Sequence, residues 1–129
     1  MDTNWDRYCS ALIHAHLAGQ SGGGAVVKAL TGEINPSGRL AESFPLKEED
    51  VPCHEIYNKY PYKMDFAEGI YVGYKYYNTF GIPVKYPFGY GLSYTTFAYS
   101  DACITDDGAR VTVTNTGERD GATVVQMYI

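Results

Sequence analysis

Tyr-Pro-Phe-Gly-Tyr-Gly-Leu-Ser-Tyr-Thr-Thr-Phe, residues 86–97, is the most distinctive stretch of this chain. Two glycines alternate in it with large aromatic side chains, a pattern typical of backbone that bends or passes close to another surface while its neighbours bury area. Pro87 fixes its own backbone torsion, and the β-branched pair Thr95-Thr96 favours an extended path. The stretch therefore predicts a segment that lies in an interface.

The same stretch resembles the segment of glycoside hydrolase family 3 enzymes that joins their α/β sandwich domain to a fibronectin-III-like domain. Further stretches resemble motifs of this family in the same order, and together they span nearly the whole chain. They are the glycine-glutamine loop GQSGGG at 19–24, the turn NPSGRL at 35–40, EGIYVGYKYY at 68–77, and NTG at 115–117 followed by DG at 120–121. One glycine motif alone is a weak signal, whereas this set in register is specific.

The resemblance implies an α/β fold followed by an all-β part. Residues 1–56 would be the end of an (α/β)6-type sandwich domain, residues 57–99 an extended aromatic interdomain arm, and residues 100–129 the first three strands of an incomplete fibronectin-III-like β-sandwich. Such a β-sandwich needs about seven strands and a doubly wound sheet needs several βα units, so we expect a fragment of a longer protein. Open β edges would favour self-association of the fragment.

Local patterns predict the elements of the first half. Periodicity alone predicts one helix over residues 2–17, whereas the resemblance implies a short helical turn followed by a buried strand over 11–17. We follow the resemblance here. Ser21 is a candidate N-cap for a helix over 25–30, and Gly32 is positioned to end that helix.

Alternation and turn signals predict the elements of the second half. Most aromatic residues of the chain lie between residues 57 and 99, and the alternation over 70–77 predicts a strand with two unlike faces. Near the carboxyl end we expect a turn between the first two of three strands. The expected segments are an extended piece at 40–44, a solvated charge run at 47–50, strands at 103–104, 111–114 and 124–129, and the turn at 106–108.

The composition excludes several classes of function. With 45% hydrophobic and 19% charged residues the chain of 129 residues is globular. A net charge of −5 and scattered basic residues argue against nucleic acid and anionic membrane surfaces as partners, and no apolar stretch approaches the length of a membrane span. Three cysteines leave at least one unpaired, which favours the cytoplasm over secretion. Nothing in the chain calls for a cofactor.

Retaining glycoside hydrolysis needs two carboxyl groups about 5 Å apart. By resemblance, the nucleophilic aspartate lies in a separate barrel domain and the acid/base glutamate precedes the glycine-glutamine loop, so we expect no catalytic residue in this chain and assign no substrate-binding residue. The carboxylates present mostly lie in turns or in the charge run, where a solvated role is expected. They are Glu33, Glu42, Glu48, Glu49, Asp50, Glu55 and Glu68. For Glu68, which opens the 68–77 motif, we expect a structural hydrogen bond to backbone.

Two other constellations suggest chemistry only weakly. The glycine loop before a helix resembles a phosphate cradle, but the Walker spacing fails at Lys28-Ala29, so a tight turn is expected, with Gln20 as the residue able to reach a sugar site. Histidines and cysteines offer nitrogen and sulfur ligands, but no paired C-x-x-C spacing exists, so we expect no metal site. A Cys-His nucleophile is less favoured still. The residues concerned are Cys9, His14, His16, Cys53 and His54.

The sequence thus predicts a fragment of a retaining family 3 β-glycosidase, similar to β-glucosidases that hydrolyse terminal β-linked sugars. Its partners would be the missing barrel and sandwich domains and, through the complete enzyme, a carbohydrate substrate; the isolated chain should be inactive. Lys75 and Asn78 stand where the family usually has arginine and aspartate, which weakens any ion pair made there. The alternative is a non-catalytic carbohydrate-binding or scaffold module, because the thirteen tyrosines offer surfaces for sugar rings.

Overall fold

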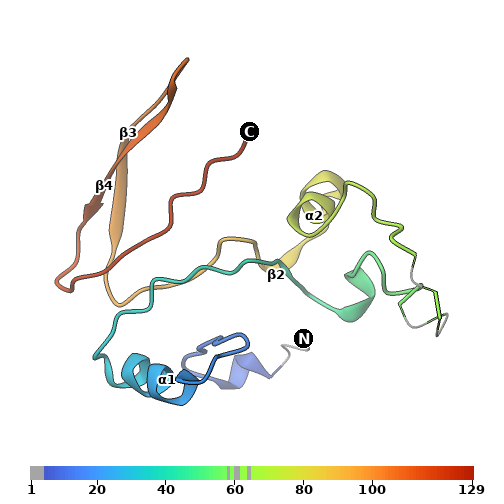
Figure 1. Ribbon diagram of the computed structural model, residues 1–129, viewed down its shortest axis with the longest axis horizontal. Helices are drawn as coiled ribbons and strands as arrows, with labels where there is room; N and C mark the ends of the chain where they lie inside the picture. Colours follow the sequence, from blue (N-terminus) through green and yellow to red (C-terminus); the bar gives the residue numbers. More distant parts are fainter. Residues whose placement is uncertain (1–4, 58, 60–61, 64) are drawn as a thin grey trace. The chain divides into compact units, whose positions relative to one another are not determined.

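The computed structural model describes residues 5–57, 59, 62–63 and 65–129 (Figure 1). It divides into two compact units, each built from two stretches of chain. Unit 1 comprises Met1–Ile13 and Arg39–Tyr90, and unit 2 comprises His14–Gly38 and Gly91–Ile129. Residues 58, 60–61 and 64 of the expected aromatic arm lie outside the described residues. Within the part that is described, no helix is both long and apolar enough to span a membrane.

Unit 1 is built around a two-stranded antiparallel sheet of β1 (Phe44–Pro45) and β2 (Val84–Tyr86). Phe44 pairs with Tyr86, is only 6% exposed, and places its ring edge-on at 6.1 Å from the ring of Tyr86. The Leu40 amide donates to the Tyr90 carbonyl at 2.8 Å, and the Gly89 amide donates to the Leu40 carbonyl. The extended piece expected at 40–44 therefore runs beside the aromatic-glycine stretch, although the assigned strand is shorter and begins only at Phe44.

The strand predicted over residues 70–77 is wrong, because Tyr74–Phe80 forms the helix α2. Gly73 adopts φ 59° and ψ −131°, a backbone conformation open mainly to glycine, and it ends the extended path before the helix begins. The helical repeat then places Tyr76 and Phe80 one turn apart, with ring centroids at 5.2 Å. It also leaves Tyr77 only 6% exposed. Packing of these aromatic rings thus favours a helix where alternation favoured a strand.

Two 3₁₀ turns complete the described part of unit 1. η1 (Asp6–Tyr8) confirms the short helical turn expected near the start of the chain. η2 (Glu48–Asp50) carries most of the predicted charge run. Lys47, Glu48 and Glu49 are exposed, as expected for a solvated run, and Asp50 is half-buried.

Unit 2 begins with a loop and the helix α1 (Gly22–Thr31). The predicted helix is confirmed, and it ends at Gly32, which adopts the left-handed conformation with φ 76°. Ser21 occupies the N-cap position, but its side chain makes no capping hydrogen bond. The buried strand expected over 11–17 is wrong: no ladder forms there among the described residues, and Leu17 is fully exposed. His16 adopts φ 51°, a left-handed conformation that interrupts an extended path.

The other part of unit 2 is a hairpin of β3 (Phe97–Thr105) and β4 (Gly108–Asn115), visible as the long orange pair of strands in Figure 1. Both strands and the turn between them confirm the prediction, although the pairing shifts register between Ser100 and Cys103. The third strand predicted at 124–129 is wrong, because this segment joins no ladder among the described residues. A strand needs a backbone ladder with a neighbour, and the bond of 3.1 Å between the Tyr99 and Thr123 hydroxyls, just before this segment, joins side chains only.

Candidate functional site

Asn35, the first residue of the NPSGRL motif, lies at the centre of a polar cluster in unit 2. Its Oδ1 accepts hydrogen bonds from the Ser93 hydroxyl at 2.9 Å and from the Tyr94 amide at 2.8 Å. Its Nδ2 donates to the Asp120 carbonyl at 3.0 Å. We call these four residues the Asn35 cluster. One amide side chain thereby joins its own motif to two others, whose contacting residues lie 58 to 85 residues further along the chain.

The Tyr94 side chain ties the same place to α1. Its hydroxyl donates to the Ala29 carbonyl at 2.8 Å, in the last turn of the helix, where carbonyls lack partners within the helix. The Arg119 guanidinium lies 5.9 Å from the centre of the Tyr94 ring, a cation–π distance. Arg119 also contacts the Gly32 carbonyl at 3.5 Å, so its positive charge lies at the negative end of the helix dipole.

The turn after β4 is held by Thr95 and Asn115. The Thr95 hydroxyl donates to Asn115 Oδ1 at 2.7 Å, and Thr95 is only 7% exposed. Asn115 Oδ1 also accepts from the Gly117 amide, and its Nδ2 donates to the Arg119 carbonyl at 2.7 Å. The side chains of Asn35, Thr95 and Asn115 thus all hydrogen-bond to other protein groups. The arrangement fixes backbone.

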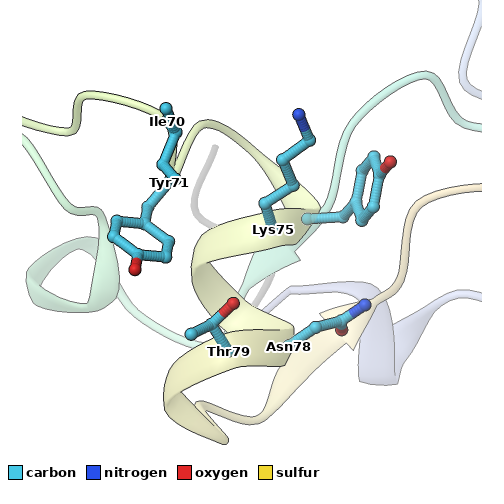
Figure 2. Close-up of a pocket in the computed structure, with 6 residues that line it drawn as sticks. Ile70, Tyr71, Lys75, Asn78 and Thr79 are labelled. Atoms are coloured by element: carbon cyan, nitrogen blue, oxygen red, sulfur yellow. The ribbon is translucent and has the colours of Figure 1, made fainter.

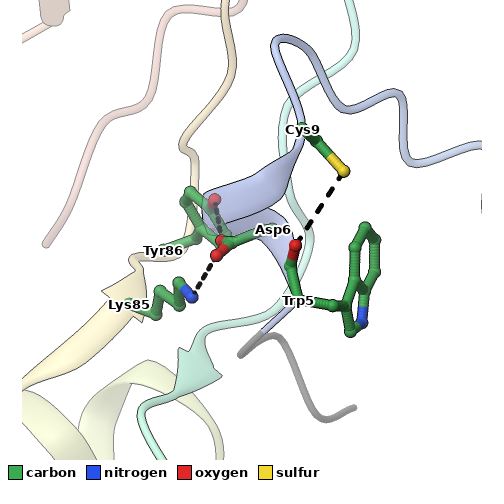
Figure 3. Close-up of polar contacts among 5 residues, drawn as sticks. All are labelled: Trp5, Asp6, Cys9, Lys85 and Tyr86. Atoms are coloured by element: carbon green, nitrogen blue, oxygen red, sulfur yellow. Dashed lines mark hydrogen bonds and ion pairs between the residues drawn. The ribbon is translucent and has the colours of Figure 1, made fainter.

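A second polar cluster, in unit 1, joins the start of the chain to β2. Asp6 accepts from Lys85 Nζ at 2.6 Å and from the Tyr86 hydroxyl at 2.7 Å, as Figure 3 shows. The Lys85 and Tyr86 hydrogen bonds hold the pKa of the Asp6 carboxyl below its ordinary value, and the bond to Asp6 raises the pKa of Tyr86. This pairing could not be predicted from the sequence, since an aspartate and a lysine 79 residues apart share no motif.

The Asp6 pairing predicts an acid-sensitive attachment. A carboxyl whose pKa is lowered by folding stabilises the fold above its unfolded pKa, near 3.9, and this stabilisation is lost as the pH falls through the folded value. Between about pH 5 and pH 2, we expect the thermal midpoint of the wild-type protein to fall more steeply than that of Asp6→Asn. Asp107→Asn, at an exposed turn, is the control and should follow the wild type. Parallel curves for wild type and Asp6→Asn would contradict the pairing.

The carboxylates singled out from the sequence are spread over the surface. Five are exposed, namely Glu33, Glu42, Glu48, Glu49 and Glu55, whereas Asp50 and Glu68 are half-buried. Glu33 pairs with Lys28 at 2.8 Å. At Glu68, the backbone carbonyl accepts from the Tyr71 amide at 2.9 Å and closes the turn that leads towards α2.

The remaining candidates fall in different places. Gln20 is exposed in the turn before α1. Nε2 of His14 lies 3.1 Å from Nδ1 of His16, although not on a strand, and within unit 2 the described residues add no third His, Cys, Asp or Glu to this pair. Cys9 contacts the Trp5 carbonyl at 4.0 Å (Figure 3). His54, next to Cys53 in sequence, places its Nδ1 3.6 Å from a Glu48 oxygen.

Lys75 and Asn78, the two departures from the family pattern, lie together on α2. Both line a shallow pocket with Ile70, Tyr71, Tyr74 and Thr79. This pocket lies on the face of a helix. It could not be predicted from the sequence, because the sequence pattern predicted a strand there.

Comparison with known proteins identifies the family. The model described as the glycosyl hydrolase family 3 C-terminal domain matches residues 1–94. The exo-alpha-(1->6)-L-arabinopyranosidase of Bifidobacterium longum is 40% identical over 130 residues, covering 97% of this chain and 17% of that protein. Thermostable beta-glucosidase B of Acetivibrio thermocellus is 40% identical over 133 residues, covering 97% of this chain and 18% of that protein. The chain therefore spans less than a fifth of the curated relatives it matches.

Solved structures give the same result. Beta-glucosidase 3B from Thermotoga neapolitana, in complex with glucose, superposes with a TM-score of 0.72 at 48% identity, over 81% of this chain and 16% of that one. The beta-glucosidase from Kluyveromyces marxianus, also in complex with glucose, superposes with a TM-score of 0.80 at 36% identity, over 93% of this chain and 15% of that one. Since the family model covers far more than half of the sequence, the chain belongs to glycosyl hydrolase family 3.

Proposed function

We propose that this chain is a structural, interdomain part of a longer retaining β-glycosidase that hydrolyses terminal β-linked sugars. The Asn35 cluster is the main observation behind this proposal. In it, the Asn35 side chain of one family motif hydrogen-bonds to residues of two other motifs and so holds these stretches of chain together. The names of relatives support the substrate class, since several are β-glucosidases. The nucleophile and the acid/base carboxyl would both come from parts of the enzyme outside residues 1–129.

We propose three segments for this part of the enzyme: the end of an α/β sandwich domain at 1–56, an interdomain arm at 57–99, and the start of a fibronectin-III-like domain at 100–129. Two observations support a boundary near the second of these, a few residues before residue 100. The family model ends its match at residue 94, and β3 begins at Phe97. The Asn35 cluster would then hold the arm to the sandwich domain at one end and to the first turn of the β-domain at the other.

An activity assay of the isolated chain tests whether the catalytic residues lie outside it. The isolated chain should not hydrolyse a chromogenic β-glucoside above the buffer rate, whereas the full-length enzyme should, because only the latter would contain the carboxyl pair. A variant of the full-length enzyme that lacks residues 1–129 is assayed beside the isolated chain as the complementary sample. Turnover by the isolated chain that survives repurification would place the catalytic pair inside it and overturn the proposal.

A further inference from the structure

A shallow pocket of about 360 Å³ lies on α2 in unit 1 and is lined by Ile70, Tyr71, Tyr74, Lys75, Asn78 and Thr79. Figure 2 shows Lys75 projecting from one turn of the helix and Asn78 and Thr79 from the next, with Ile70 and Tyr71 contributed by the segment that precedes it. The volume is within the range of small-molecule sites, about 300–1,000 Å³. We call this the α2 pocket.

Both tyrosine rings of the α2 pocket are backed by a second aromatic ring. Tyr71 packs edge-on against Phe80, with ring centroids 5.2 Å apart at an interplanar angle of 60°. Tyr74 lies against Phe88, with centroids 4.8 Å apart and a tilt of 32°. Rings held in this way lose little conformational freedom when a ligand binds. The two tyrosine rings are therefore preorganised as walls of the pocket.

Among the residues that line the α2 pocket, positive charge is present and negative charge is absent. Lys75 is its one ionised side chain, Asn78 and Thr79 add neutral donors and acceptors, and no carboxylate is among the lining residues. Across the described residues, Lys75 takes part in none of the ion pairs. The pocket therefore combines two aromatic rings, hydroxyl and amide groups, and one ammonium that pairs with no carboxylate in the part of the chain that the structure describes.

We propose that the α2 pocket binds a carboxylate-bearing sugar ring. Lys75 would pair with the carboxylate, Asn78 and Thr79 would exchange hydrogen bonds with the ring hydroxyls, and the tyrosines would pack against the C–H face of the ring. That the ligand is a sugar rests on the proposed function, whereas its negative charge follows from Lys75.

The proposal is tested by titrating the full-length enzyme with D-glucuronate and measuring the binding by isothermal titration calorimetry. Lys75→Gln should weaken glucuronate binding about three- to tenfold, because a charge-assisted hydrogen bond at an exposed site is lost. Lys75→Arg keeps the charge and should bind within about twofold of the wild type. Lys63→Gln, which removes an exposed lysine of the same unit paired with Asp65, is the matched control and should change nothing.

D-Glucose, which has the same ring without the carboxylate, is the neutral probe, and its affinity should not change in Lys75→Gln. The proposal is overturned if glucuronate fails to bind the wild-type enzyme, or binds Lys75→Gln as tightly as the wild type. Turnover of a chromogenic β-glucoside is measured on the same samples. If glucuronate binds Lys75→Gln as tightly as the wild type while turnover is intact, only the proposed binding site is rejected. If the wild type shows no turnover, the proposed function is rejected.

Discussion

Replacement of Asn35 by alanine is expected to destabilise the full-length enzyme by about 2–4 kcal/mol. The estimate follows from the loss of three hydrogen bonds at once, each contributing about 0.5–1.5 kcal/mol. The substitution leaves the Ser93 hydroxyl, the Tyr94 amide and the Asp120 carbonyl without their side-chain partner. Because these groups lie in two stretches of chain, at 93–94 and at 120, and Asn35 lies in a third, the loss should loosen all three stretches together.

Hydrogen exchange of the peptide that contains Tyr94 gives the local readout, and the thermal midpoint gives the global one. Asn35→Asp is the graded variant: it keeps the acceptor for Ser93 and Tyr94 but turns a carboxylate oxygen towards the Asp120 carbonyl, so an intermediate loss is expected. Glu118→Gln, an exposed change in the same turn region, is the control. Wild-type exchange at Tyr94 in Asn35→Ala would show that the Asn35 cluster does not hold the segment around Tyr94.

The second large effect is expected at Gly117, where alanine should cost about 1–3 kcal/mol through overpacking. A Cβ at this position would overlap the Thr95 hydroxyl and would lie 3.1 Å from the Thr96 amide nitrogen. Thr95 is buried and its hydroxyl is engaged with Asn115, so the clash cannot be relieved by turning a flexible side chain away. The turn between β4 and the following segment should therefore open.

Gly38→Ala is the matched control for this prediction. A Cβ at Gly38 would meet nothing within 4 Å, and its backbone does not need the left-handed region. Denaturant titration of both variants of the full-length enzyme should show a lower midpoint for Gly117→Ala and no loss for Gly38→Ala. Equal midpoints for the two alanine variants would mean that the close approach of Gly117 to Thr95 is not maintained in solution.

Local signals in the sequence predicted those elements that depend on few distant partners. The helix that ends at Gly32 and the hairpin with its turn at 106–108 follow from a helix-ending glycine and from strand alternation around an Asp-Asp-Gly turn, and both are present. The segments at 11–17 and 124–129 failed because a strand is defined by its neighbour, and a short apolar run carries no information about who that neighbour is.

The helix α2 shows a different reason for failure. Alternating Ile70, Val72 and Tyr74 suggested two faces of a strand, but a positive φ at Gly73 and the ring contacts of Tyr76 with Phe80 favour a helix. The Asn35 cluster was only half predictable. Its three motifs were recognised in the sequence as separate stretches, whereas the hydrogen bonds that join them depend on how the chain folds back over 85 residues.

We propose that the catalytic chemistry lies outside these 129 residues. The test is to trap the covalent intermediate in the full-length protein with a slowly hydrolysed 2-deoxy-2-fluoro-β-glucoside and to map the labelled peptide by mass spectrometry. A retaining mechanism predicts one glycosylated carboxylate per active site. We expect this carboxylate in a peptide outside residues 1–129; a label on any aspartate or glutamate within them, or no covalent adduct despite inactivation, would overturn the proposal.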